Sequence, residues 1–252
     1  VSDVIRNNKD GQYGSAYLSA QKNIDNMVGK VAGDCEKLIG IFKPKFDANP
    51  DDEALLDQIT GLLDKLDCTE DDFYLQVAVA KYKLNPSADA AFSIGKAYYK
   101  RKKYGDANKF FTEVVGGTED KDMLFESYQY MAAGYLSTGQ PQSAKTYALK
   151  MLGINPNSGD AYIIIGNAYA KGKGDCGKDD CTARAAYWAA VDKFQKAKAV
   201  DPSVAEKAQQ YINSYSAQFP KKEECFFVGM TNGQSYTLEC WIGETTTVRT
   251  RD

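Results

Sequence analysis

The stretch Asp160–Tyr169, DAYIIIGNAY, decides the fold, because a related stretch stands earlier in the chain at Ala90–Tyr98, AAFSIGKAY. In both stretches an isoleucine–glycine pair is followed by tyrosine three residues after the glycine. A pattern that recurs with a period in the thirties is typical of a helical repeat array, in which one unit cannot bury its own apolar face. We therefore expect an all-α fold made of stacked helix pairs.

A second signal follows each of these stretches one helix later, as an alanine and a phenylalanine four residues apart. These pairs are Ala107 with Phe111, and Ala190 with Phe194. An Asn-Pro or Asp-Pro dipeptide marks the joins between units, with the prolines at Pro86, Pro156 and Pro202. The small glycine and alanine predict a close approach of the two helices of a unit, and the tyrosine and phenylalanine predict the packing between units.

The composition excludes several classes of function. The 252 residues are 43% hydrophobic and 26% charged, with a formal net charge of −3, which is ordinary for a soluble globular protein and not for a nucleic-acid-binding one. No apolar run approaches the roughly 18 to 20 residues of a membrane-spanning helix. The chain has no histidine, which removes Ser-His and Cys-His nucleophilic machinery and the commonest zinc ligand. We expect no enzymatic activity, no cofactor and no bound metal.

Two acidic clusters precede apolar helical stretches, Asp51–Glu53 and Thr69–Asp72. They could be read as paired catalytic carboxylates. Helix capping is the better interpretation, because negative charge at the start of a helix meets the positive end of the helix dipole.

The six cysteines indicate disulfide bonds. Residues Cys225–Ile242, CFFVGMTNGQSYTLECWI, predict a β-hairpin with its turn at Asn232-Gly233. Cys225 and Cys240 are equally far from this turn, so they would face each other with Cα atoms about 5.5 Å apart, within the span of a disulfide. A bulge in the hairpin would shift this register.

The other cysteines are assigned with less direct arguments. Cys176 and Cys181 close a short polar loop, for which a disulfide is favoured over a metal site because no second pair of cysteines accompanies it. Cys35 and Cys68 are paired by elimination. Three disulfides favour the periplasm, the cell surface or secretion, with a signal peptide removed ahead of Val1, and buried reduced thiols in a cytosolic protein are the alternative.

The chain is predicted to have three parts. Residues 1–15 are polar and expected to be loose, residues 16–219 form about five helix pairs and a capping helix, and residues 220–252 form a disulfide-linked β-hairpin or three-stranded appendage, with Thr245–Arg249 as the third strand. From Tyr169 to Ala190 the chain carries 12 residues more than the corresponding unit, and this insertion over 170–181 contains two of the cysteines. Insertions in repeat arrays form loops that contact a ligand or remain idle on the surface, and both readings stay open.

At these positions the sequence resembles the tetratricopeptide repeat family, and its cysteines and C-terminal hairpin resemble exported members from Gram-negative bacterial envelopes. The resemblance implies a right-handed α-solenoid whose concave groove, lined by the first helix of each repeat, binds peptides. Placed on this chain, the groove positions are Asp89, Phe92, Lys96, Tyr99, Gln129, Tyr130, Ala133, Asp160, Ile163 and Asn167.

The resemblance does not reproduce the Lys and Asn set with which some members clamp a C-terminal carboxylate. Lys96 and Asn167 are suitably placed, but Phe92 and Ile163 stand where basic companions are expected. Tyr99 and Tyr130 could anchor an extended segment or simply cover the inner helix surface.

The leading hypothesis is a non-catalytic scaffold that binds protein or peptide in an exported, envelope-associated compartment. The second is a module that binds carbohydrate or a cell-wall polymer through the aromatic-rich groove or through the hairpin that carries Trp241. An enzyme that uses Asp or Glu ranks last.

Overall fold

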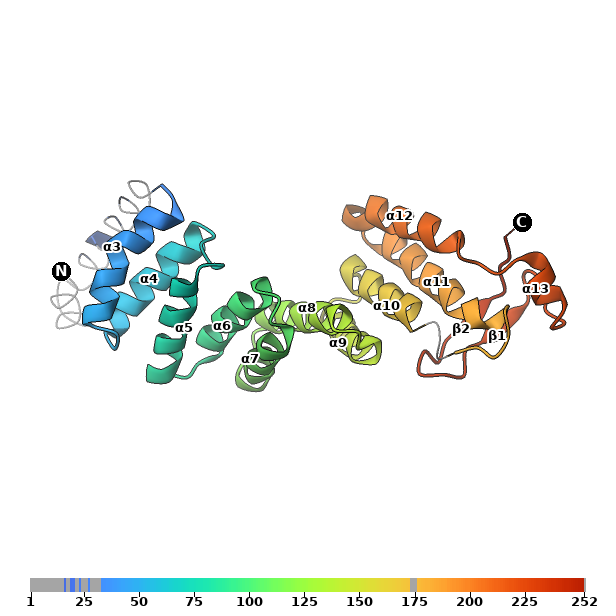
Figure 1. The fold of residues 1–252 in the computed structure, drawn as a ribbon, viewed down its shortest axis with the longest axis horizontal. Coiled ribbons are helices and arrows are strands. Elements are labelled where there is room, and N and C mark those ends of the chain that lie inside the picture. The colour runs from blue at the N-terminus through green and yellow to red at the C-terminus, as the bar shows by residue number, and fades with distance from the viewer. Residues whose placement is uncertain are drawn as a thin grey trace. The chain divides into compact units, whose positions relative to one another are not determined.

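The computed structural model describes residues 33–172 and 176–251, with five single helical positions before residue 33. The predicted loose segment 1–15 therefore lies outside the described residues. Of the helical part predicted over residues 16–219, the structure describes continuous helices from Cys35 onward. The described residues fall into two compact units that divide between Thr118 and Glu119, in the link between the helices labelled α7 and α8 in Figure 1, and each unit is considered by itself.

The first unit is built from helices. They are α3 (Cys35–Ala48), α4 (Glu53–Lys65), α5 (Asp72–Leu84), α6 (Ala88–Lys100) and α7 (Tyr104–Gly117). Neighbours along the chain pack against each other, most extensively α6 with α7.

The second unit contains helices followed by a small sheet. The helices are α8 (Lys121–Ser137), α9 (Pro141–Ile154), α10 (Gly159–Lys171), α11 (Ala185–Val200), α12 (Ala205–Ser216) and α13 (Lys222–Phe226), with the short 3₁₀ helices η2 (Thr182–Arg184) and η3 (Pro202–Val204). The strands are β1 (Ser235–Thr237) and β2 (Thr245–Thr247). Helices α8 and α9, and α10 and α11, pack as pairs, which is the predicted arrangement.

Side-chain caps set the start of most of the long helices. The capping oxygens belong to Asp34, Asp52, Asp71, Ser87, Asp120 and Ser158. Each accepts a hydrogen bond from a backbone N–H of the first turn, such as Leu55 N–H to Asp52 at 3.2 Å. Capping is thus confirmed for Asp52 and Asp71, which belong to the two acidic clusters.

Two glycines set how closely the helices of a pair approach. A Cβ atom on Gly95 would lie 2.8 Å from the Phe111 ring, and one on Gly166 would lie 2.6 Å from the Phe194 ring. Both phenylalanines are fully buried. The glycine of the first helix and the phenylalanine of the second are therefore in contact in α6–α7 and α10–α11, which confirms the basis of the repeat pattern.

Disulfide Cys35–Cys68 joins the start of α3 to the residues after α4, with Cα atoms 5.6 Å apart. This pairing is the predicted one. The apolar side chains around it form one core in the first unit, which includes Leu38, Leu63 and Phe73.

Helix α11 lies at the centre of the second unit, and every residue from Ala185 to Val191 is buried. Helix α12 covers one side of it, where Tyr211 and Tyr215 stack on Phe194 with ring centroids 5.0 and 5.5 Å away. The C-terminal segment covers another side.

The C-terminal sheet differs from the predicted hairpin. Strand β1 pairs antiparallel with β2, with Tyr236 opposite Thr246, and not with residues 225–230. The turn at Asn232-Gly233 is present, and Gly233 has φ +90°, but Cys225 before the turn belongs to helix α13. The prediction of a hairpin over Cys225–Ile242 is wrong because Lys222–Phe226 are helical and the residues from there to the turn form no strand. The segment expected as a third strand supplies the partner of β1.

Two of the three predicted disulfides are also wrong. The structure joins Cys176 to Cys240 and Cys181 to Cys225, with Cα atoms 5.2 and 4.8 Å apart. Each bond therefore runs from the insertion between α10 and α11 to the C-terminal segment, and neither closes a local loop. The physical reason is that the insertion and the C-terminal segment pack side by side, so each cysteine lies next to a partner that is distant in the sequence.

A proteolytic digest of the unreduced protein should contain peptides that link Cys176 to Cys240 and Cys181 to Cys225. Mass spectrometry before and after reduction measures this directly. Recovery of the local pairs, Cys176 with Cys181 and Cys225 with Cys240, would contradict the described fold of the C-terminal segment.

Polar contacts hold the sheet on α11. The Trp188 indole N–H donates to the carbonyl oxygen of Arg249 at 2.7 Å, and the Arg249 guanidinium donates to the carbonyl oxygen of Trp188 at 3.0 Å. Asp192 accepts from the Thr246 hydroxyl at 2.5 Å and forms an ion pair with Arg249. Between these contacts Leu238, Ile242 and Val248 are buried.

Within the described part of the chain, no helix combines the length and the apolar character that a membrane crossing needs.

Candidate partner-binding surfaces

In the first unit, Asp89, Phe92, Lys96 and Tyr99 lie three or four residues apart on α6 and therefore share one face of that helix. Asp89 is exposed and the other three are half-buried. This row of side chains, which we call the α6 strip, offers an acidic group, two aromatic rings and an ammonium group to a ligand.

Ring contacts support the α6 strip from beneath. Phe92 meets Phe111 edge to face with ring centroids 5.9 Å apart, and Tyr99 meets Tyr104 in the same way at 5.2 Å. The Lys96 Nζ atom lies 5.2 Å from the centroid of the Phe92 ring. The aromatic rings are thus held in place and are partly exposed, which is a property of side chains that anchor a bound segment.

Lysines give the end of α6 a local positive charge. Lys100 donates a hydrogen bond to Asp67 at 2.5 Å, and this bond, together with the charge of Lys100 and then of Lys96, lowers the pKa of the Asp67 carboxyl. Asp67 is thereby kept ionised beside the strip.

In the second unit, the predicted positions on α8 and α10 have different surroundings. Gln129 and Tyr130 on α8 are half-buried. On α10, Ile163 is only 3% exposed, so it cannot serve as a contact residue in this structure. Helix α12 engages the other two, because Asp160 pairs with Lys207 at 3.5 Å and Asn167 accepts from the Tyr215 hydroxyl at 3.3 Å.

The α12 side chains are the part of this surface that the sequence interpretation missed. Lys207, Tyr211 and Tyr215 recur every four residues and so lie on one face of α12. This periodicity is visible in the sequence, but it was interpreted only as a capping helix. The structure places Lys207 and Tyr215 directly beside α10.

A separate group of polar side chains lies where the C-terminal segment meets the helices. The Tyr169 hydroxyl donates to Glu244 at 2.7 Å, and Lys193 pairs with Glu244 at 2.8 Å. Lys145 donates to the carbonyl oxygen of Ile242 at 2.7 Å. Burial and the bond to Glu244 raise the pKa of Tyr169, so its phenol stays protonated, and burial lowers the pKa of Lys145. These hydrogen bonds and this ion pair attach the C-terminal segment to α9, α10 and α11.

Trp241 belongs to the same contact. A Cβ atom on Gly172 would lie 2.3 Å from the Trp241 ring, and the ring meets Tyr169 edge to face with centroids 5.9 Å apart. The indole nitrogen is buried. The Trp241 ring therefore packs against α10 and remains partly exposed.

Replacing Glu244 with glutamine should make the second unit less stable at neutral pH by about 1 kcal/mol, because this half-buried carboxylate loses its ion pair. Burial raises the pKa of Glu244, but the bonds from Lys193 and Tyr169 outweigh it, so the folded pKa lies below the ordinary 4.5. A lowered folded pKa contributes stability that is present above 4.5 and is lost as the pH falls through the folded pKa.

Urea unfolding from pH 7 to pH 3 measures this effect. The difference between wild type and Glu244→Gln should shrink below pH 4.5, and the exposed Glu223→Gln variant should follow the wild type throughout. A difference that does not change with pH would show that the carboxylate charge is not what stabilises this contact.

No group of three or more His, Cys, Asp or Glu side chains within the described ranges could hold a metal ion. All six cysteines of the chain are joined in the three disulfides.

Known structures with a similar fold exist. A crystal structure of MamA protein has a TM-score of 0.55 at 19% identity and covers 75% of this chain and 96% of its own. A second MamA structure has a TM-score of 0.53 at 21% identity, with coverages of 70% and 94%. YrrB, described as a TPR protein with an unusual peptide-binding site, has a TM-score of 0.49 at 19% identity, with coverages of 70% and 82%. No protein-family model and no curated protein sequence matches the chain.

Proposed function

Because the chain has the tetratricopeptide repeat fold, we propose that it is a non-catalytic scaffold that binds a protein or peptide on the first helices of its repeats. The observation that carries this proposal is the α6 strip. There Phe92, Lys96 and Tyr99 are aligned on one helix face and supported by rings of the next helix.

The chemistry of the strip favours an extended segment with apolar and acidic side chains. Aromatic edges provide apolar contact at small entropic cost, and the ammonium group of Lys96 suits a carboxylate of the ligand. In the second unit Gln129 and Tyr130 are the corresponding contact residues, and Asp160 and Asn167 contribute only where α12 leaves them accessible.

We assign the protein to the periplasm or the cell surface. Three disulfides support this proposal, since such bonds persist in oxidising compartments and are rare in the cytosol. Two of these disulfides attach the C-terminal segment to the rest of the second unit. The strands of this segment have only three residues each, so without the disulfides the segment would be held less firmly.

The test is recovery of partners from cell-envelope extract with purified wild-type protein and two variants. Lys96→Glu/Tyr99→Ser changes the strip, whereas Lys109→Glu is the matched charge reversal on α7, where the side chain is exposed. Wild type and Lys109→Glu should recover the same polypeptide, and the strip variant should recover at least about tenfold less, as for the loss of an aromatic and a charged anchor. Equal recovery by all three proteins, or recovery of glycan alone, would refute the proposal.

A further inference from the structure

A pair of phenylalanines is exposed at the end of α13. Phe226 is 74% exposed and Phe227 is 85% exposed, and Val228 after them is 41% exposed. We call these three residues the aromatic knob. Such large consecutive apolar side chains in water mark a site of interaction when the backbone beneath them is fixed.

The backbone of the knob is fixed in two ways. Cys225, directly before it, is buried and bonded to the buried Cys181. The helix then ends in a Schellman motif, in which Met230 N–H donates to the Cys225 carbonyl at 2.9 Å and Gly229 N–H donates to the Phe226 carbonyl at 3.0 Å. Gly229 has the positive φ of +75° that this motif requires. The knob is therefore preorganised, as aromatic anchors of protein interfaces are.

The charges around the knob favour a protein pocket over a lipid bilayer. Lys221, Lys222 and Glu223 are all exposed just before it. Membrane-binding faces are rich in Lys and Arg, whereas an acidic side chain at the same level is repelled by anionic lipid. Mixed charges are what a pocket with both signs at its rim would match.

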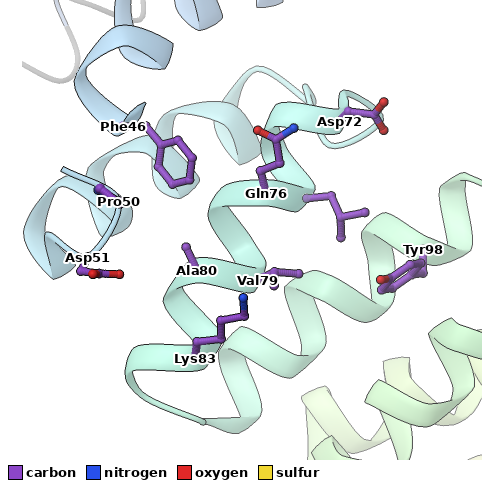
Figure 2. A pocket seen from close by; sticks show the side chains of 10 residues that line it. Phe46, Pro50, Asp51, Asp72, Gln76, Val79, Ala80, Lys83 and Tyr98 are labelled. Carbon is purple, nitrogen blue, oxygen red and sulfur yellow. The ribbon is translucent and has the colours of Figure 1, made fainter. Parts of the chain in front are cut away.

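The first unit contains an apolar cleft of about 570 Å³. Its floor is the exposed side of α5, with Leu75, Val79 and Ala80, and Figure 2 shows Phe46 and Tyr98 on opposite sides of Val79 and Ala80. The volume lies in the range of pockets that hold compact apolar ligands.

Charges of both signs line the rim of this cleft. Asp51 and Asp72 are acidic and Lys83 is basic, and all three are exposed. Asp72 also pairs with Arg101, and Lys83 extends along the cleft in Figure 2.

We propose that the aromatic knob of one copy of this chain inserts into the α5 cleft of a second copy. Phe226 and Phe227 would fill the apolar floor, Lys221 and Lys222 would face Asp51 and Asp72, and Glu223 would face Lys83. The knob and the cleft are different surfaces, so the contact is heterologous and builds open chains or rings of protomers. It uses neither the α6 strip nor the α8 and α10 positions, so a scaffold assembled in this way keeps its partner-binding residues.

Sedimentation velocity of the oxidised protein over a wide concentration range tests the proposal. The wild type should form a concentration-dependent series of oligomers. Phe226→Ser/Phe227→Ser should raise the apparent dissociation constant about 100-fold, in line with the loss of two buried phenylalanine side chains. Ala80→Trp, which fills the cleft, should do the same, and Gln76→Trp at the cleft lining provides a second blocking variant should the first fail to fold.

The decisive experiment mixes the knob variant, Phe226→Ser/Phe227→Ser, with the cleft variant, Ala80→Trp. Each variant alone should be monomeric. In the mixture, the intact knob of the cleft variant can insert into the intact cleft of the knob variant, so a 1:1 pair should form that grows no further. Leu149→Ser, which changes a leucine on α9 that is 49% exposed, should associate like the wild type.

Three results would overturn the proposal. They are a wild type that stays monomeric at all concentrations, oligomers that persist in both variants, and a mixture that does not pair although the wild type associates. Binding of monomers to anionic vesicles that is lost in the knob variant would instead assign the knob to a membrane surface.

Discussion

Phe194→Ala is expected to destabilise the second unit by about 3–5 kcal/mol, the cost of removing a fully buried phenylalanine and leaving a cavity. The Phe194 ring fills the space between α10, α11 and α12, against Gly166 on one side and Tyr211 and Tyr215 on the other. Urea unfolding monitored by circular dichroism measures the change. Phe226→Ala, which truncates an exposed ring, should stay within about 0.5 kcal/mol of the wild type.

The contact between Gly166 and Phe194 can be tested further with a double-mutant cycle. Gly166→Ala alone should destabilise, because the new methyl group would meet the Phe194 ring, although alanine is the better helix former by about 1 kcal/mol. In the Phe194→Ala background the same change should cost less or become favourable, since the methyl group enters the vacated space. Additive effects would show that the two helices do not approach as described.

Removing the disulfide Cys181–Cys225 is expected to cost about 3 kcal/mol in the chain-entropy model, since with Cys176–Cys240 intact it closes only the two arms from 176 to 181 and from 225 to 240. Cys181→Ala/Cys225→Ala is the appropriate variant because both positions are buried and alanine fits them. The loss should appear as faster hydrogen exchange in α13, β1 and β2, measured by mass spectrometry.

The second bond of this segment provides a matched comparison. With Cys181–Cys225 intact, Cys176–Cys240 closes the same two arms, so its removal should also cost about 3 kcal/mol. Cys35→Ala/Cys68→Ala should leave exchange in α13, β1 and β2 unchanged, because that bond lies in the first unit. If the double alanine variant at 181 and 225 exchanged like the wild type, packing alone would hold the segment.

The helical repeat could be predicted from the sequence because its signals are local and agree with one another. The tyrosine three residues after Gly95 recurs three residues after Gly166, and the Ala107–Phe111 spacing recurs in Ala190–Phe194. The caps Asp52 and Asp71 stand where apolar periodicity begins. In such a fold each helix packs mainly on its neighbours in the chain, so local patterns carry most of the information.

The C-terminal segment could not be predicted in this way, because long-range contacts decide it. The run Cys225–Val228 is short and apolar, and its pattern suits a strand or a helix end equally well. In the structure Cys225 is bonded to Cys181 and β1 pairs with β2, and both partners are distant in the sequence. Pairing cysteines by local geometry therefore gave two wrong bonds out of three.

Helix periodicity alone places some of the candidate contact residues, and contacts with other helices decide the accessibility of the rest. The positions on α6 are placed by helix periodicity alone, so Phe92, Lys96 and Tyr99 share a face as expected. On α10 the neighbouring α12 decides accessibility, and a pattern within one helix cannot show that Ile163 is covered.

The central claim is that the first helices of the repeats bind a partner protein, and photo-crosslinking tests it most directly. A photoreactive amino acid is placed at Tyr99 or Tyr130 on first helices, and at Lys109 or Leu149 on second helices, in cells that make the protein. The account predicts that both first-helix positions crosslink to the same polypeptide and that the second-helix positions do not. Crosslinks that arise only from Lys109 or Leu149, or none from Tyr99 and Tyr130, would contradict it.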